Sequence, residues 1–95
     1  MSERDAWKLT PRMLDDRSAA LFVKVPTENV ILFQAFIELY DGVAAVRTVD
    51  RMNSILCLLT TLDFLEDCRA ILDALQPELG WRIPEVDGGA SWVAV

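Results

Sequence analysis

The sequence predicts an α+β domain of the split βαβ kind (βαββαβ), in which an antiparallel sheet carries two helices on one face. Three observations support this fold class. Strand-like and helix-like segments alternate in the order strand, helix, strand, strand, helix, strand. Both helical segments have an apolar side that a sheet can cover. The chain has 95 residues, which suits one domain and leaves little room for a second.

The first half of the predicted domain is a strand followed by an apolar helix. Residues 18–25 alternate between two faces, and Pro26 ends the strand. Residues 28–40 are mostly apolar and predict a helix. Thr27 stands where an N-cap is expected, and Gly42 stands where a left-handed residue would close the helix.

The second half begins with two strands. Residues 43–50 are rich in valine, and a polar break over 51–54 has the length of a hairpin turn. The following strand, 55–61, is apolar on both faces. The element order predicts that this strand and the first one are central in the sheet, and that an extended segment, 81–86, forms an edge strand.

The second helix opens with a capping-box pattern, Asp63 as N-cap with Glu66 three residues later. Pro77 and Gly80 mark its end. After the strand over 81–86, an Asp-Gly turn at Asp87 predicts a hairpin and an extra C-terminal strand.

The first 17 residues carry charges of both signs and no sustained period. We expect residues 1–17 to be a flexible or loosely docked tail, and residues 18–95 to be the single domain.

The net charge of −6, with no histidine, argues against binding to nucleic acid and to anionic membranes. No apolar run approaches the roughly 20 residues that span a bilayer, and the N-terminus has no apolar signal core. We therefore expect a cytoplasmic protein.

The residue types argue against catalysis. Without histidine, Ser-His and Cys-His mechanisms and most transition-metal sites are excluded. The two cysteines, Cys57 and Cys68, lie in apolar patterns and form no CxxC pair. No glycine-rich phosphate loop is present. The sequence predicts no enzyme, no cofactor and no metal.

Two segments are candidates for contacts with a ligand or a partner: the loop that leads into the first helix, and the end of the strand over 43–50. The candidate residues are Pro26, Thr27, Glu28, Asn29, Arg47, Asp50 and Arg51. Arg47 interrupts a valine-rich strand. It is either a surface arginine paired with a nearby carboxylate or a contact for an anion or a partner.

More than half of the residues are hydrophobic, and a domain of this size has little interior to hide them in. We therefore expect a homodimer, joined through the sheet face that carries no helix. Phe22, Leu56 and Leu58 are the candidate interface residues. If the strand over 55–61 has the opposite parity, Ile55, Cys57 and Leu59 take that place.

The motifs Tyr40-Asp41-Gly42 and Val46-Arg47-Thr48-Val49-Asp50, with the apolar helix before them, resemble an uncharacterised family of small bacterial domains of unknown function. The resemblance extends from about Phe22 to Leu79 and implies a ferredoxin-like fold without an assigned activity.

The architecture is also similar to that of ACT regulatory domains, whose ligands meet the loop after the first strand. In this chain the loop lacks the Asp and Gly that are typical there.

Two hypotheses for the function follow. The first is a non-catalytic homodimeric module for protein interaction or regulation, with a possible protein partner. The second is an ACT-like small-molecule sensor with its ligand at a subunit interface.

Overall fold

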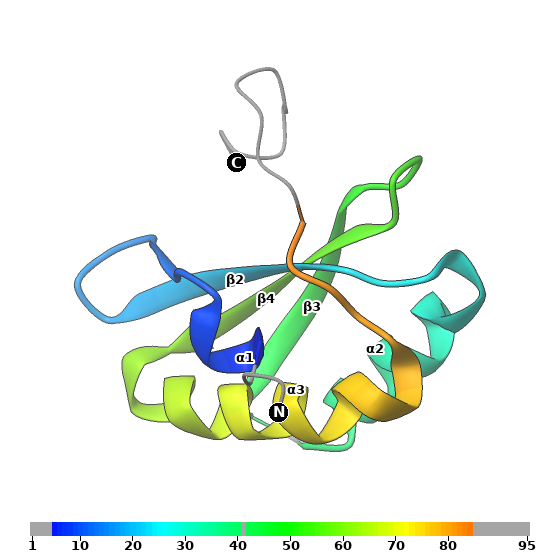
Figure 1. Ribbon diagram of the computed structural model, residues 1–95. Helices are drawn as coiled ribbons and strands as arrows, with labels where there is room; N and C mark the ends of the chain where they lie inside the picture. Colours follow the sequence, from blue (N-terminus) through cyan, green and yellow to red (C-terminus); the bar gives the residue numbers. More distant parts are fainter. Residues whose placement is uncertain (1–4, 41, 85–95) are drawn as a thin grey trace.

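The computed structural model describes residues 5–40 and 42–84, which form a four-stranded antiparallel sheet with its helices on one face (Figure 1). The strands lie in the order β1 (Arg12–Met13), β2 (Ser18–Lys24), β4 (Ile55–Thr61) and β3 (Ala44–Asp50). The helices are α1 (Asp5–Lys8), α2 (Val30–Glu38) and α3 (Leu65–Leu79). The predicted α+β fold class is confirmed, and the order β2-β4-β3 is compatible with a ferredoxin-like split βαβ arrangement.

The core lies between the sheet and the helices, and the register of β2 against β4 decides which side chains enter it. Leu21 lies opposite Leu58, and Val23 lies opposite Leu56. Residues that face each other across an antiparallel pair share one side of the sheet. These four side chains are fully buried beneath α2 and α3, together with Phe33 of α2.

This register corrects the predicted interface. Leu56 and Leu58 face the helices, so they do not lie on the outer face of the sheet. Phe22 does lie on that face, where it is directly opposite Cys57. The alternative parity is therefore the one observed. The sequence could not decide between the two because both sides of β4 are apolar and no polar residue marks the outer one.

The outer edge of β2 is paired at two places. Near its start, β1 pairs through Arg12 opposite Ala20. At its end, Lys24 exchanges two backbone hydrogen bonds with Arg82, of 2.8 and 2.7 Å. Within the described residues, the predicted edge strand over 81–86 is reduced to this bridge. The predicted Asp-Gly hairpin and C-terminal strand lie outside the described residues.

Part of the segment expected to be a tail belongs to the fold. Ala6 and Leu9 are buried, and α1 packs against α3. The Arg69 guanidinium donates a hydrogen bond of 2.6 Å to the carbonyl of Ala6. Other apolar side chains of this segment, Trp7, Met13 and Leu14, are about half exposed. Residues 5–13 are therefore ordered against the core because two small apolar side chains fit beneath α3 and the sheet.

The starts of both long helices differ from the prediction. Single 3-10 turns, η1 (Thr27–Asn29) and η2 (Leu62–Phe64), precede α2 and α3. Neither Thr27 nor Asp63 acts as an N-cap, and no side chain caps the first turn of α2 or α3. The predicted caps are wrong because the tighter turns begin at these residues and place them inside the turn.

The ends of the helices agree better with the prediction. Gly42 has a φ of +83°, the left-handed conformation that was predicted for it. Gly80 has a φ of +69° and donates a hydrogen bond of 2.8 Å to the carbonyl of Gln76, which closes α3. Pro77 does not end α3, which continues to Leu79. A proline inside a helix lacks its own N–H bond and its ring crowds the carbonyl four residues before it, but the residues after it can still donate their bonds.

Candidate functional site

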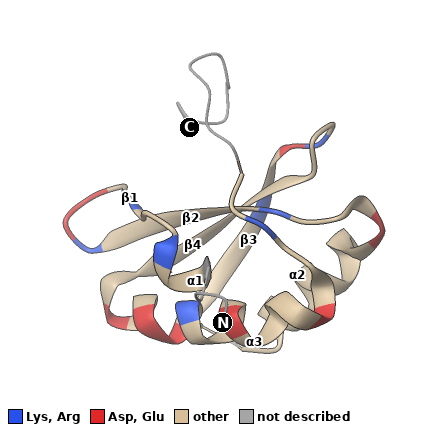
Figure 2. Ribbon diagram, in the orientation of Figure 1, with Lys and Arg blue, Asp and Glu red and all other residues tan. Residues whose placement is uncertain are grey.

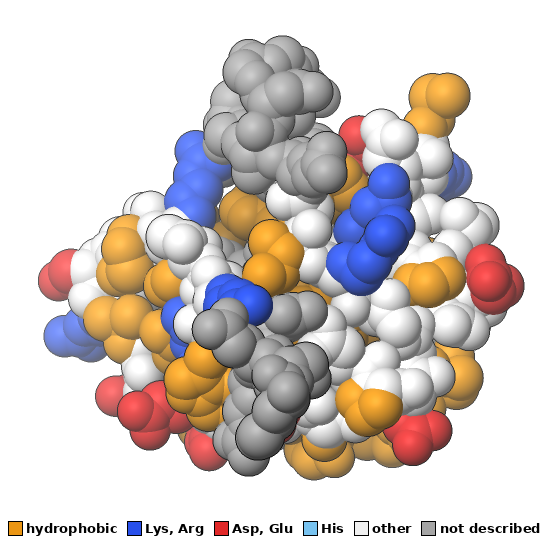
Figure 3. All heavy atoms as spheres, viewed as in Figure 1, with side chains coloured by type: hydrophobic (Ala, Val, Ile, Leu, Met, Phe, Trp, Pro, Cys, Tyr) orange, Lys and Arg blue, Asp and Glu red, His pale blue; other side chains and the backbone are white. Residues whose placement is uncertain are grey.

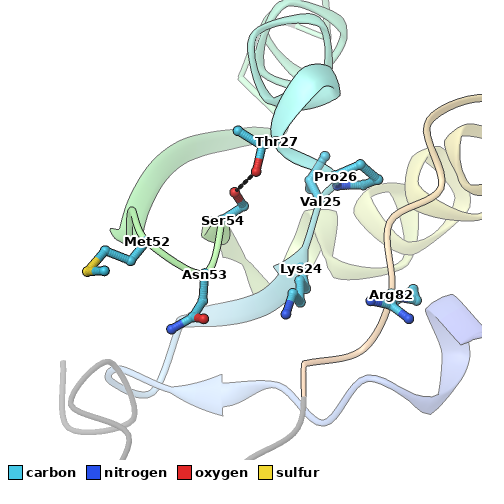
Figure 4. A pocket seen from close by; sticks show the side chains of 8 residues that line it. All are labelled: Lys24, Val25, Pro26, Thr27, Met52, Asn53, Ser54 and Arg82. Carbon is cyan, nitrogen blue, oxygen red and sulfur yellow. Dashed lines mark hydrogen bonds between the residues drawn. The ribbon is translucent and has the colours of Figure 1, made fainter.

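A pocket of about 340 Å³ opens where the end of β2, the β3–β4 hairpin and the segment after α3 meet (Figure 4). We call it the Lys24–Arg82 pocket. Its lining residues are Lys24, Val25, Pro26, Thr27, Met52, Asn53, Ser54 and Arg82. All eight belong to one chain, so the pocket needs no second subunit to be complete.

Two cations of the pocket lie side by side. Because Lys24 and Arg82 exchange both of their backbone hydrogen bonds, their side chains leave the backbone on the same side. Figure 4 shows the ammonium of Lys24 and the guanidinium of Arg82 pointing in the same direction. The lining contains no carboxylate. The described lining therefore carries two positive charges and no negative one.

Two hydroxyls close the opposite wall. Thr27 Oγ1 and Ser54 Oγ are 2.7 Å apart and form a hydrogen bond in which either can be the donor. Ser54 is buried and has a φ of +55°, and its carbonyl accepts a hydrogen bond of 3.0 Å from the Val25 N–H. The conformation of Ser54 thus ties the hairpin to the end of β2. The hydroxyl that accepts keeps its own proton for a further acceptor.

Asp50 braces the hairpin at the edge of the pocket. Its carboxylate accepts hydrogen bonds from the backbone N–H of Asn53 at 3.1 Å and from the side-chain amide of Asn53 at 2.9 Å. These bonds hold the pKa of Asp50 below its ordinary value, and the charge of Lys24 adds a smaller effect in the same direction. Asp50 therefore stabilises the turn that carries Asn53 and Ser54.

The structure brings only two of the predicted contact residues together in this pocket, Pro26 and Thr27. Glu28 is exposed outside it. Asn29 donates a hydrogen bond of 3.0 Å to the carbonyl of Leu79, so it joins the start of α2 to the end of α3.

The predicted residues of the second segment lie elsewhere. Arg47 is on the outer face of the sheet, opposite Cys57, and Arg51 is exposed on the hairpin. Asp50 supports the pocket without lining it.

Sequence reasoning missed the two cations of the pocket. Lys24 and Arg82 are far apart in the chain, and only the pairing of the post-helix segment with β2 places them together. Asn53 and Ser54 looked like ordinary turn residues. The available signal was the predicted edge strand over 81–86, since an edge strand beside β2 would place Arg82 close to its end.

A second unusual surface lies on α2. Ile31 is 81% exposed and Leu39 is 75% exposed. Leu32, Ala35 and Tyr40 are also exposed beside them. We call these five residues the α2 apolar face. Aliphatic side chains on a solvent-facing helix surface are typical of a contact with another molecule when they form a continuous patch.

The charged side chains are distributed unevenly. Acidic side chains follow α3, whereas lysine and arginine are found mainly on the strands and on the segment after α3 (Figure 2). On the face seen in Figure 3, basic side chains lie at several separate places, with a large group right of centre, and acidic ones lie around the periphery. The basic side chains on this face thus do not form one patch.

Both cysteines are buried thiols. Burial raises the pKa of Cys68 to about 11, although Arg69 acts in the opposite direction. Burial also raises the pKa of Cys57, and Arg47 and Arg12 partly oppose it. A buried thiol with a raised pKa is a poor nucleophile.

In residues 5–40 and 42–84, no group of three or more potential ligands among His, Cys, Asp and Glu is placed to hold a metal ion. None of the helices in this part of the chain has the length and hydrophobicity to cross a membrane.

The sheet order and the helices on one face make this a small α+β domain whose arrangement is compatible with the split βαβ type. The chain belongs to the family described as Domain of unknown function (DUF4911), whose model matches residues 23–78. This confirms the resemblance to an uncharacterised family of small domains. The matched segment runs from β2 to the last turn of α3. Comparison with the curated proteins and with the solved structures finds no match.

Proposed function

We propose that this domain is a non-catalytic interaction module that acts as a homodimer, with the α2 apolar face as its main contact. The observation that carries the proposal is the exposure of Ile31 and Leu39 on one side of the same helix. Ile31 and the C-cap residue Leu39 are eight positions apart, about 12 Å along the helix, so they form one ridge with Ala35 between them.

A second copy of the chain is the occupant that suits this surface best. The five residues of the face are uncharged, and the exposed Glu38 lies on the same side of the helix, seven residues after Ile31. A two-fold contact between two copies of the face therefore has to keep this carboxylate at its solvated rim. Burying each large side chain contributes roughly 1.5–3 kcal/mol. Two copies of the ridge therefore supply a driving force of the size that dimers of small domains need.

The dimer contact must extend beyond the helix itself. The nine residues of α2 span only about 14 Å, whereas a stable interface buries about 800 Å² on each partner. The adjacent edge strand β3 packs beside α2 and can complete the area. In such a dimer the sheet edge and the helix of one copy meet those of the other.

Sedimentation equilibrium tests the proposal directly. We expect a dimer mass for the wild-type protein at tens of micromolar, and a monomer mass for the double variant Ile31→Glu, Leu39→Glu. The matched control is Ala74→Glu, which adds a carboxylate at an exposed position of α3. This variant should remain a dimer. A monomeric wild type, or a double variant that stays dimeric, would contradict the proposal.

A second candidate function is small-molecule sensing of the ACT kind. It is favoured by the Lys24–Arg82 pocket, which lies at the loop after the first long strand, where Pro26 and Thr27 were expected to meet a ligand. In this version the ligand occupies a pocket of one chain and alters the dimer contact from there. Sedimentation with and without a bound ligand tests that coupling, and an unchanged dimer constant would contradict sensing.

A further inference from the structure

The register at the edge of β2 creates an electrostatic problem within one chain. Lys24 and Arg82 form a hydrogen-bonded pair of an antiparallel bridge, so their Cα atoms are about 5.5 Å apart and their side chains share a side. Like charges directly opposite each other in a sheet are destabilising. An anion bound between the two side chains would offset the repulsion between their charges.

The protein itself offers little compensation at this place. Between described residues, neither the Lys24 ammonium nor the Arg82 guanidinium makes a hydrogen bond or an ion pair with a carboxylate. The nearest acidic influence is Asp50, whose oxygens already accept both hydrogen bonds from Asn53. The N–H donors of these two side chains are therefore available to an acceptor that is not one of the described residues.

The remaining lining suits an oxyanion. A guanidinium offers two parallel donors that match a carboxylate or a phosphate, and an ammonium adds a point charge. The Thr27–Ser54 pair keeps one hydroxyl proton that can be donated across the pocket. Pro26 adds an apolar side chain to the lining, whereas Val25 is fully buried and Met52 is 95% exposed at the hairpin.

We propose that the Lys24–Arg82 pocket binds a small molecule through its carboxylate or phosphate group, which lies between Lys24 and Arg82. The volume of about 340 Å³ is at the small end of ligand pockets, so the ligand is a metabolite of a few carbon atoms and not a nucleotide or a lipid. The inference rests on the ligand-binding candidate function and is independent of the proposed dimer, because one chain supplies every lining residue.

The test is a two-dimensional ¹H–¹⁵N NMR titration of the full-length protein at constant ionic strength. The probes are inorganic phosphate, succinate and succinamide, the last being the uncharged analogue of succinate. We expect saturable shifts of the amides of Thr27, Asn53 and Ser54 with phosphate or succinate and none with succinamide. The affinity should fall as the salt concentration rises, because screening weakens charge attraction.

Three single variants assign the site. Lys24→Gln and Arg82→Gln should each weaken binding roughly 10-fold, as expected for losing a charge-assisted hydrogen bond. Arg51→Gln is the matched control, since it removes the same charge from the hairpin outside the lining, and it should change affinity by less than about 2-fold. Each pocket variant relieves the repulsion between the two cations, so it should unfold at the same temperature as the wild type or at a higher one.

Each outcome has a distinct meaning. Tighter binding of phosphate than of succinate assigns the ligand as a phosphate ester, and the reverse assigns it as a carboxylate; both support the inference. If succinamide binds and the two anions do not, the inference that the ligand is an anion is overturned, although the pocket still binds a ligand. If none of the three probes binds, the inference fails, and the sensing function is judged separately by the sedimentation measurement. Equal anion affinities in the wild type and the two pocket variants would place the site elsewhere and overturn the inference.

Discussion

Helices α2 and α3 cover the same face of one sheet, yet they present opposite surfaces to the outside. The outward side of α3 carries Glu66, Asp67 and Glu78 and follows the usual amphipathic pattern. The outward side of α2 carries Ile31, Leu32 and Leu39. Both inward sides are apolar and buried, through Phe33 and Ile37 in α2 and through Cys68 and Leu72 in α3.

The surfaces of the two helices are therefore set by different constraints. The composition of α3 is explained by its packing on the sheet alone. That of α2 is not, because only one of its sides meets the core, and its exposed side carries Ile31, Leu32 and Leu39 with a single carboxylate, Glu38. A helix with so much apolar surface outside the core is expected to be covered on more than one side. This is the physical reason for placing a partner on α2 and not on α3.

The largest expected effects test whether the core-facing sides of α2 and α3 contribute equally to stability. Phe33→Ala should reduce the free energy of unfolding by about 3–5 kcal/mol, and Leu72→Ala by about 2–5 kcal/mol, because each removes a fully buried side chain and leaves a cavity. Urea denaturation followed by circular dichroism measures both. A loss below about 1 kcal/mol for Phe33→Ala alone would mean that α2 contributes little to the core.

A smaller effect concerns the dry interior beneath α3. The unfolded Cys68 thiol loses its proton above pH 9.0, whereas the folded thiol, with a pKa of about 11, keeps it. The contribution of the protonated Cys68 thiol to the free energy of unfolding is therefore complete below pH 9.0. It is lost as the pH rises towards 11, by up to about 3 kcal/mol.

Denaturation of the wild type and of Cys68→Ala across this range provides the measurement. The comparison cancels the other groups that titrate there, and the variant should show a shallower decline in the free energy of unfolding. Parallel curves for the two proteins would show that this thiol is accessible to water.

The glycines that follow the two helices should respond alike. Gly42→Ala and Gly80→Ala should each cost about 1–2 kcal/mol, because both residues have a positive φ that alanine adopts poorly. Neither change is blocked sterically. A Cβ at Gly42 would meet no atom within 4 Å, and at Gly80 it would lie 3.6 Å from Cγ of Pro26. Thermal unfolding would measure the losses, and an unchanged midpoint for Gly42→Ala would indicate a different turn after α2.

The smallest effect probes the single side-chain bond that joins the start of α2 to the end of α3. Asn29→Ala should cost about 0.5–1.5 kcal/mol through the lost bond to the Leu79 carbonyl. Asn29→Asp should cost more, since a carboxylate would face the negative end of α3. Glu28→Gln, at the exposed neighbouring position, should leave stability unchanged. Equal stability of Asn29→Ala and Asn29→Asp would indicate that the contact with α3 is absent in solution.

The three long strands were predictable because their boundaries are marked in the sequence. Pro26 follows β2, and the polar residues 51–54 separate β3 from β4. The starts of the helices were not predictable in the same way. Ser, Thr and Asp residues before an apolar run indicate that a helix begins nearby, but a 3-10 turn accommodates the same residues without a cap.

The predicted contact residues and the candidate pocket share one loop, whereas most of the pocket's lining comes from residues that were not predicted. Pro26 and Thr27 border the pocket because any chain that leaves β2 must pass there. The charges that define the pocket come from a pairing between residues 24 and 82. The sequence indicated an edge strand over 81–86 but gave neither its partner strand nor its register. The same limitation explains the misplaced Leu56 and Leu58, whose direction depends on the register between β2 and β4.

The strand order also has a consequence for synthesis of the chain on the ribosome. The strands β2 and β3 are made first, but each pairs with β4 and not with the other. Until Thr61 has been added, neither strand has a complete partner, and the apolar side chains of α2 have no finished sheet to cover. We therefore expect no stable partial domain to form during translation. An arrest-peptide force measurement at increasing chain lengths should register one folding event, after α3 has emerged.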